Sequence, residues 1–181
     1  MAIFISILRG INVSGQKKIL MQDLKALYEQ LKFNTIGTYI QSGNVVFSTD
    51  KKTDTQKLSK EIEQAIQTKY QFDVPVIVRS LDQMQQIVTA NPFLKEKNIN
   101  PEKLHVTFLD KKPSVENIKN IESLSFLPDR FVLIETDVFL HCPDSYGDTK
   151  LSNKFFENKL KVQATTRNWK TVNKLLEMAS A

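Results

Sequence analysis

Two glycines separated by four residues stand between a predicted strand and a predicted helix, where a phosphate could bind. The segment reads Gly10-Ile-Asn-Val-Ser-Gly15-Gln-Lys-Lys18. A P-loop has this glycine spacing followed by Lys and then Ser or Thr. Gln16 and Lys17 occupy those two positions here, which argues against a nucleoside triphosphatase. Two interpretations stay open: a looser anion site using Arg9, Asn12, Lys17 and Lys18, or a connecting loop whose glycines allow positive φ.

A second candidate anion site lies near the end of the chain, in Thr165-Thr-Arg-Asn-Trp169. The spacing of apolar residues predicts a helix from about Thr166, with Thr165 or Thr166 as its cap. The positive end of that helix would then lie beside Arg167 and Asn168. The alternative is an ordinary helix cap with Trp169 in the core.

Two further polar segments could supply ligand-binding or acid–base groups. Gln41-Ser-Gly-Asn44 is a tight-turn signal, and its Gly and Asn tolerate positive φ. Ser42 and Asn44 would adjoin the Gly10–Lys18 loop if the strand register brings them together. The loop from Asp144 to Ser152 offers Tyr146 and Lys150 among several carboxylates.

Metal and nucleophile chemistry has few candidates. The chain has two histidines, His105 and His141, and one cysteine, Cys142. His141 and Cys142 are consecutive on a predicted strand, so their side chains point to opposite faces. A zinc site needs more His and Cys ligands than these. We therefore expect no metal and no cofactor, and the sequence identifies no catalytic residue.

The first eighty or so residues predict the order β-α-β-β-α-β, a ferredoxin-like unit. Ile3–Leu8 is an apolar strand, and leucines from Leu20 follow helical spacing. Short strands at 38–41 and 44–48 flank the Ser42-Gly43 turn. A capping-box pattern at Thr53-x-x-Gln56 begins the second helix, and 74–79 is the last strand.

The second half predicts a similar but degenerate order. A capping box at Ser80-x-x-Gln83 begins a helix through about Ala90. A strand at 105–109, a helix from Ser114, a hairpin at 131–141 and helices from about Ser152 and Thr166 follow, with the last strand missing or replaced. We therefore predict an α+β fold with subdomains at 1–80 and 81–181.

RNA-recognition modules share the first unit's topology and stack bases on aromatic residues of the two central strands. The corresponding strands carry only Phe4 and Phe47, without the Gly-aromatic signature of those modules. Apolar residues on both strand faces also predict a buried sheet. The sequence therefore disfavours an RNA-recognition module.

Charge is concentrated toward the C-terminus. The chain carries a net charge of +5, and the segment 150–174 holds seven basic side chains against Glu157 alone. This excess could attract nucleic acid or another anion, or it could be a solvated surface. No apolar run approaches the roughly 20 residues that cross a bilayer. With one cysteine and no signal-peptide pattern, the sequence favours a cytoplasmic protein.

Several of these segments together resemble a known family. Leu-Arg-Gly-Ile-Asn-Val-Ser-Gly at 8–15, Tyr39-Ile-Gln-Ser-Gly-Asn-Val-Val-Phe47, Thr165-Thr-Arg-Asn-Trp-Lys-Thr-Val172 and Tyr-Gly-x-x-Lys-Leu at 146–151 are similar to blocks of the bacterial family called domain of unknown function 1697. Ser14 and Lys170 depart from the usual pattern, which has Gly and Asn there. The resemblance implies a cytosolic bacterial protein of two α+β halves, and it implies no catalytic residue.

These observations predict a ligand cleft between or beside the two subdomains, whose expected ligand is a phosphate-bearing small molecule or nucleotide. Alternatives are a nucleic-acid-binding module using the basic C-terminal segment, and an interaction protein without a ligand. Whether the protein is an enzyme stays open, as does its oligomeric state. The polar residues expected to bind the ligand are Arg9, Asn12, Lys17, Ser42, Asn44, Lys150, Arg167 and Asn168.

Overall fold

The computed structural model describes residues 1–181, which form two compact units. Unit 1 comprises Met1–Gln86 and Lys174–Ala181, and unit 2 comprises Ile87–Asn173. Each unit contains one four-stranded sheet in which every neighbouring pair of strands is antiparallel. The chain is therefore an α+β protein, as its sequence predicts. None of its helices combines the length and the apolar character needed to span a bilayer.

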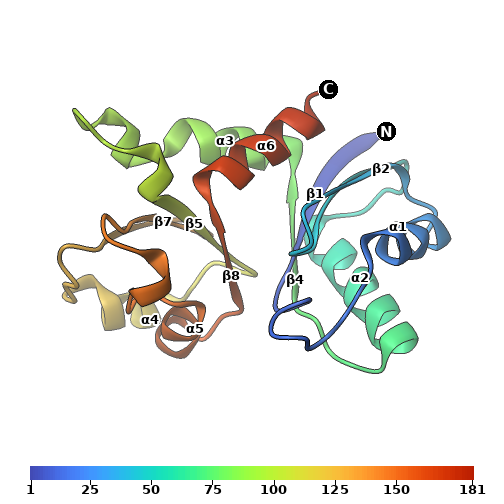
Figure 1. Ribbon diagram of the computed structural model, residues 1–181, viewed down its shortest axis with the longest axis horizontal. Helices are drawn as coiled ribbons and strands as arrows, with labels where there is room; N and C mark the ends of the chain where they lie inside the picture. Colours follow the sequence, from blue (N-terminus) through green and yellow to red (C-terminus); the bar gives the residue numbers. More distant parts are fainter. The chain divides into compact units, whose positions relative to one another are not determined.

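Unit 1 has the predicted order β-α-β-β-α-β, and its sheet has the strand order β2-β3-β1-β4. Figure 1 shows α1 and α2 together on one side of this sheet. The elements are β1 (Ala2–Leu8), α1 (Met21–Gln30), β2 (Asn34–Tyr39), β3 (Asn44–Thr49), α2 (Thr55–Tyr70) and β4 (Val76–Ser80), followed by α3 (Leu81–Ala90).

The core of unit 1 lies between its sheet and the apolar stripes of α1 and α2. Leu24 and Tyr28 of α1 and Leu58 of α2 are buried against Phe4 and Phe47 of the strands. These two phenylalanines stack with ring centroids 5.9 Å apart. Because both rings belong to the core, they cannot stack on RNA bases. The opposite sheet face is also buried, since Ile5, Ile7 and Ile77 are at most 2% exposed.

Unit 2 repeats the order of unit 1, and its sheet has the order β6-β7-β5-β8. In Figure 1, α4 and α5 lie together at the lower edge of unit 2. The elements are β5 (Leu104–Leu109), α4 (Val115–Glu122), β6 (Arg130–Ile134), β7 (Asp137–His141), α5 (Asn153–Leu160) and β8 (Ala164–Asn168), followed by α6 (Trp169–Ala179).

The last strand of unit 2 corrects the sequence prediction, which placed a helix there. Residues Ala164–Asn168 form β8, and α6 begins only at Trp169. β8 pairs with β5 over five residue pairs, with Thr166 opposite Thr107. Threonines are common at helix caps but also favour strands, and pairing with β5 decides between the two. The predicted cap at Thr165 or Thr166 is therefore wrong.

The predicted capping boxes have mixed outcomes. At the start of α3, Ser80 N–H donates to Gln83 Oε1 over 2.9 Å, and Gln83 N–H donates to Ser80 Oγ over 3.2 Å. This box is confirmed. At the start of α2 the cap is Asp54, which accepts from Lys57 N–H over 2.9 Å. The box predicted at Thr53 is therefore wrong by one residue.

The β2–β3 turn packs against the loop that follows β1, and this contact requires a glycine. Gly43 has φ +82°, and a Cβ placed on it would lie 2.7 Å from Leu8 Cβ and 2.8 Å from Ile11 Cδ1. Neither neighbour can withdraw easily, because Leu8 and Ile11 are both buried. A side chain at this position would push the turn and the loop apart.

We expect Gly43→Ala to destabilise the protein by about 2–5 kcal/mol, from left-handed strain plus overpacking. Gly10→Ala is the matched control, since Gly10 also has positive φ (+74°) but its Cβ would meet no atom within 4 Å. That control should cost only about 1–2 kcal/mol. Urea unfolding measures both. Equal losses would contradict the close approach described here.

Candidate functional site

Two of the polar segments found in the sequence meet in unit 1. Leu8 N–H, at the end of β1, donates to Gly43 O over 2.9 Å. Asn12 Nδ2, in the loop after β1, donates to Gln41 O over 2.8 Å. The sequence left open whether the Gly10–Lys18 loop and the 41–44 turn would touch. The register of β1 with β3 places them side by side, since Ile7 pairs with Asn44.

Asn12 holds this loop and this turn together. Its Nδ2 also donates to Ile19 O, and its Oδ1 accepts from Ile19 N–H, both over 2.9 Å. An amide nitrogen has two hydrogens, so both donors of Asn12 are used. The geometry therefore gives Asn12 a structural role. Its predicted contact with a ligand stays a prediction.

Asn44 and Ser42 also support the turn. Asn44 Nδ2 donates to Tyr39 O over 3.0 Å and to Ser42 Oγ over 2.9 Å, and Asn44 is fully buried. Both of its hydrogens are therefore used within the turn. Ser42 is half-buried at the surface of the turn.

The loop before α1 does not have the shape of a P-loop. It folds back on itself, because Asn12 N–H donates to Lys17 O over 3.2 Å and Gln16 N–H donates to Val13 O over 2.9 Å. α1 begins only at Met21, with no side-chain cap. The backbone therefore does not lead from Gly15 directly into a helix N-terminus.

The cations of this loop lie near the entrance to β4. Arg9 N–H donates to Pro75 O over 3.0 Å, and Lys17 Nζ donates to Asp73 O. Both Arg9 and Lys17 are half-buried. The loop therefore carries the half-buried Arg9 and Lys17 and the exposed Lys18, and their contact with an anion stays a prediction.

In unit 2, Arg167 is a cation taken partly out of water on the edge strand β8. Its Nη1 donates to Thr165 Oγ1 over 3.1 Å and to Thr166 O over 2.9 Å. These two acceptors are neutral. Burial lowers the pKa of the Arg167 guanidinium to about 10, so it keeps its charge at neutral pH at a cost in hydration.

Tyr146 and His105 form a stacked pair near Arg167. Their rings are 4.5 Å apart at an interplanar angle of 20°, and the Tyr146 phenol interacts electrostatically with the Arg167 guanidinium. His105 Nδ1 is buried and has no hydrogen-bond partner. Burial lowers the pKa of His105, so its imidazole is neutral at physiological pH. The sequence indicated Tyr146 as a candidate acid–base group, but it did not indicate His105 as a residue of this site.

The other two predicted residues of unit 2 have different surroundings. Asn168 caps α6, because its Oδ1 accepts from Thr171 N–H over 2.8 Å. The exposed Lys150 lines a pocket of about 370 Å³ together with Asp129, Asp144 and Asp148. Three carboxylates beside Lys150 offset its attraction for an anion. Their roles in binding stay predictions, and the geometry favours Arg167 over both.

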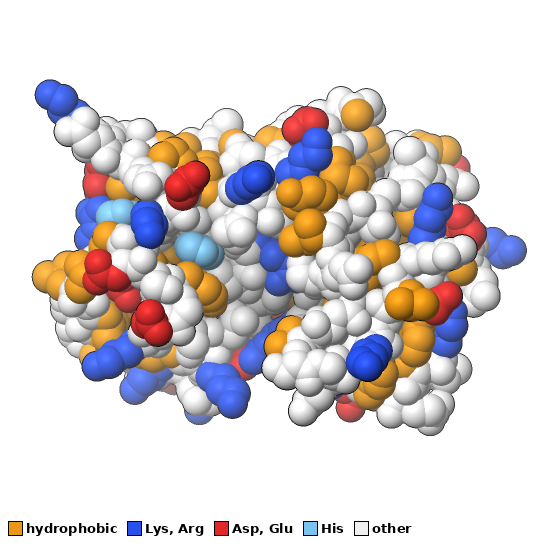
Figure 2. All heavy atoms as spheres, in the orientation of Figure 1, with side chains coloured by type: hydrophobic (Ala, Val, Ile, Leu, Met, Phe, Trp, Pro, Cys, Tyr) orange, Lys and Arg blue, Asp and Glu red, His pale blue; other side chains and the backbone are white.

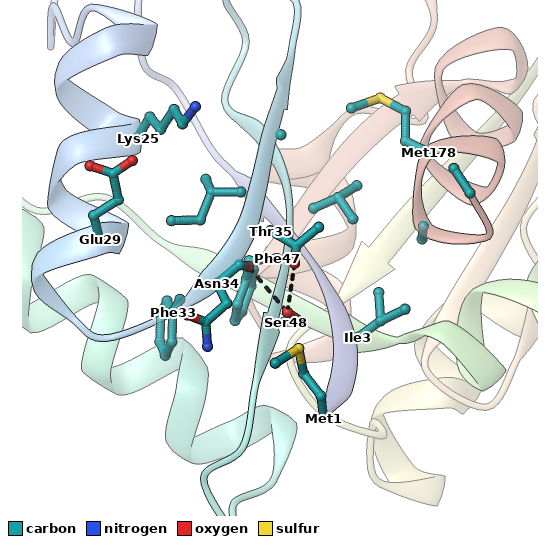
Figure 3. Close-up of a pocket in the computed structure, with 15 residues that line it drawn as sticks. Met1, Ile3, Lys25, Glu29, Phe33, Asn34, Thr35, Phe47, Ser48 and Met178 are labelled. Carbon is teal, nitrogen blue, oxygen red and sulfur yellow. Dashed lines mark hydrogen bonds between the residues drawn. The ribbon is translucent and has the colours of Figure 1, made fainter.

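Unit 1 also contains a pocket that the sequence did not indicate. It has a volume of about 980 Å³ and surrounds the start of β2 (Figure 3). It depends on a β-bulge between Asn34 and Gly37. A bulge shifts the two-residue alternation of a strand. The sequence of β2 therefore lacks the alternation of apolar and polar residues that would indicate which side chains line the pocket.

The remaining reactive groups show no arrangement for metal or thiol chemistry. No three His, Cys, Asp or Glu side chains are placed to hold a metal ion. Cys142 is buried, and burial raises the pKa of its thiol to about 11. The thiol is therefore protonated and unreactive at neutral pH.

The fold and these sites define a protein of two α+β units, each built on one antiparallel four-stranded sheet. The model of the family described as Protein of unknown function (DUF1697) matches residues 1–139, and the chain belongs to this family. This confirms the resemblance seen in the sequence motifs. No curated protein matches the chain.

Among solved structures, the chain is similar to the conserved bacterial protein SP0830 from Streptococcus pneumoniae. The TM-score is 0.77 at 22% sequence identity, and the match covers 98% of this chain and 98% of that chain. At this identity the similarity shows a common fold across both units.

We expect Asn12→Ala to lower the free energy of unfolding by about 2–4 kcal/mol. The substitution removes three hydrogen bonds and leaves the backbone N–H and C=O of Ile19 without the partners that Asn12 provides. Asn98→Ala is the matched control. Asn98 also has positive φ (64° against 57° for Asn12) but is exposed and makes no side-chain hydrogen bond. The control should cost about 1 kcal/mol or less. Urea unfolding compares them, and a small loss for Asn12→Ala would refute its structural role.

His105 should make the protein less stable in mild acid. Its folded pKa lies below the ordinary 6.5, so the unfolded chain binds the proton first and stability falls as pH drops below about 6.5. His105→Phe keeps a ring against Tyr146 and removes this titration. Its unfolding free energy should change less between pH 8 and pH 5.5 than that of the parent protein. His141 is present in both proteins, so an unchanged difference would refute the burial of a neutral His105.

Proposed function

We propose that the protein binds a phosphate-bearing small molecule through Arg167 of unit 2. The proposal depends on a half-buried guanidinium that is fixed on β8 by the oxygens of Thr165 and Thr166, where loss of hydration lowers its pKa to about 10. Removing a cation from water is unfavourable unless an anion or strong acceptors compensate. The oxygens of Thr165 and Thr166 accept hydrogen bonds from Arg167, and a phosphate would add an opposite charge.

The chemistry of the side chain favours phosphate over other anions. A guanidinium offers planar, paired donors that match two phosphate oxygens, and it is more weakly hydrated than a lysine ammonium. Arg167 also immediately precedes the N-cap Asn168, and α6 starts at Trp169. The positive end of the helix dipole therefore adds to the charge of Arg167.

Tyr146 is the second group that supports the proposal. Its phenol interacts electrostatically with Arg167, and its ring is held by stacking on His105. A phenolic O–H can donate to a phosphate oxygen, and its position is restricted by the stack. Arg9 and Lys17 of unit 1 are proposed as further cations for the same class of ligand. No chemical step is assigned to any of these groups.

Nucleic acid is the second candidate, because seven basic side chains lie in residues 150–174. These side chains are spread over the loop before α5, α5 itself, the connection from α5 to β8, β8 and α6. On the face drawn in Figure 2, Lys and Arg are scattered among acidic side chains. The half-buried Arg167 suits one small anion better than an extended nucleic-acid backbone.

Trp169 can test the proposal, because it is the only tryptophan in the chain and lies two residues after Arg167. We would titrate pyrophosphate, ATP and a short oligonucleotide at 50 and 200 mM salt and follow Trp169 fluorescence. We expect saturable binding of a small phosphate compound that persists at 200 mM salt. Arg167→Ala should weaken it about 10- to 100-fold, the effect of losing a charge-assisted hydrogen bond.

Lys170→Ala is the matched control, because it removes an exposed positive charge beside the same tryptophan. It should change the affinity little. If both variants weaken binding equally, a diffuse surface charge explains it. A response to the oligonucleotide alone, lost at 200 mM salt, would replace the proposal with nucleic-acid binding. Absence of any response from Trp169, together with no heat of binding by calorimetry, would refute the proposal.

A further inference from the structure

The pocket around the start of β2 has walls of two kinds. On the side of the sheet away from α1 it is lined by Ile3, Val46 and Met178, with Met1 at its end, and these are apolar side chains. Lys25 and Glu29 of α1 lie on the other side of the strand (Figure 3). At about 980 Å³ it is within the size range of small-molecule sites, which are mostly apolar with a few polar groups.

The polar groups of the pocket come from the β-bulge. Ser48 is only 3% exposed, and its Oγ lies 3.3 Å from both Asn34 O and Thr35 Oγ1, so these two acceptors share its single hydrogen. Figure 3 shows these bonds in the middle of the pocket. The Thr35 side chain is exposed and its hydroxyl hydrogen can rotate, so it can donate to a ligand while Thr35 Oγ1 accepts from Ser48.

Thr35 has a backbone conformation that its residue type disfavours. Its φ is +48°, in the left-handed region, where a β-branched residue is rare. Bulges that redirect one side chain are common beside binding sites. Here the bulge turns Thr35 toward Ser48 and the apolar wall. β2 also passes close to Met178 at Gly37, where an added Cβ would lie 3.2 Å from Met178 Cε.

We propose that this pocket binds a neutral, largely apolar small molecule that carries a hydrogen-bond acceptor, such as a ketone or ester carbonyl. Ile3, Val46 and Met178 contact its apolar part, and the Thr35 hydroxyl donates to its acceptor. Lys25 and Glu29 contribute one charge of each sign, so the lining side chains favour neither a cation nor an anion. This site is independent of Arg167 and of the phosphate-binding proposal.

The four methionines make a direct test possible with 2-octanone as the probe. Met1 and Met178 line the pocket, Met84 is fully buried, and Met21 packs on the core of unit 1. In protein labelled with ¹³C at the methionine methyls, 2-octanone should shift Met178 and Met1 saturably and leave Met84 unchanged. Equal shifts of Met178 and Met84 would show nonspecific partition, and no shift up to the solubility limit would show no site. Either result overturns the proposal.

Two variants test the assigned contacts. Thr35→Val keeps the branched shape and removes the hydroxyl, and it should weaken 2-octanone binding about two- to ten-fold. Thr38→Val, on the same strand, is the matched control and should leave the affinity unchanged. Met178→Lys places a charge in the apolar wall and should abolish binding without touching the bulge. An unchanged affinity in Thr35→Val would remove the assigned donor, and an unchanged affinity in Met178→Lys would place the ligand elsewhere.

Discussion

The structure of unit 1 depends on one close approach, between the β2–β3 turn and the loop that follows β1. Gly43 lies so close to the side chains of Leu8 and Ile11 that a Cβ on residue 43 would overlap both of them. The Asn12 side chain then bonds the loop to itself and to the turn. Without this contact the 12-residue connection from β1 to α1, at 9–20, would have few fixed points. A single glycine and a single amide therefore order a long polar segment.

Polar residues of the sequence motifs have two different roles, support of the backbone and the proposed binding of an anion, and the motifs alone do not distinguish them. Asn12, Asn44 and Asn168 all use side-chain atoms to satisfy backbone groups, in a loop, a turn and a helix cap. Arg167 differs, because its charge is partly removed from water and two of its acceptors are neutral. Asparagine amides are commonly used within turns and caps, whereas a desolvated guanidinium gains strongly from an anion. The proposed binding role therefore belongs to the cation and not to the asparagines.

Local patterns in the sequence predicted most elements because their signals are short-range. The apolar strand β1 and the capping box of α3 were predicted, since alternation and capping act within a few residues. β2 was predicted four residues too late, because the bulge at Thr35 interrupts the alternation. β8 was mistaken for a helix, because its conformation is fixed by pairing with β5, where Thr107 and Thr166 hydroxyls meet at 2.7 Å. The partner of Asn12 at Gln41 is likewise 29 positions away and leaves no local signal.

The most direct measurement of this division of roles is a titration with pyrophosphate followed by NMR of ¹⁵N-labelled side chains. Arg167 Nε–H and the Trp169 indole N–H should shift saturably. The side-chain amide signals of Asn12 and Asn44 should stay in place and exchange slowly with solvent, as expected for hydrogen-bonded, ordered groups. Saturable shifts of the Asn12 and Asn44 amides, with Arg167 and Trp169 unchanged, would contradict the account and assign binding to the turn and loop of unit 1.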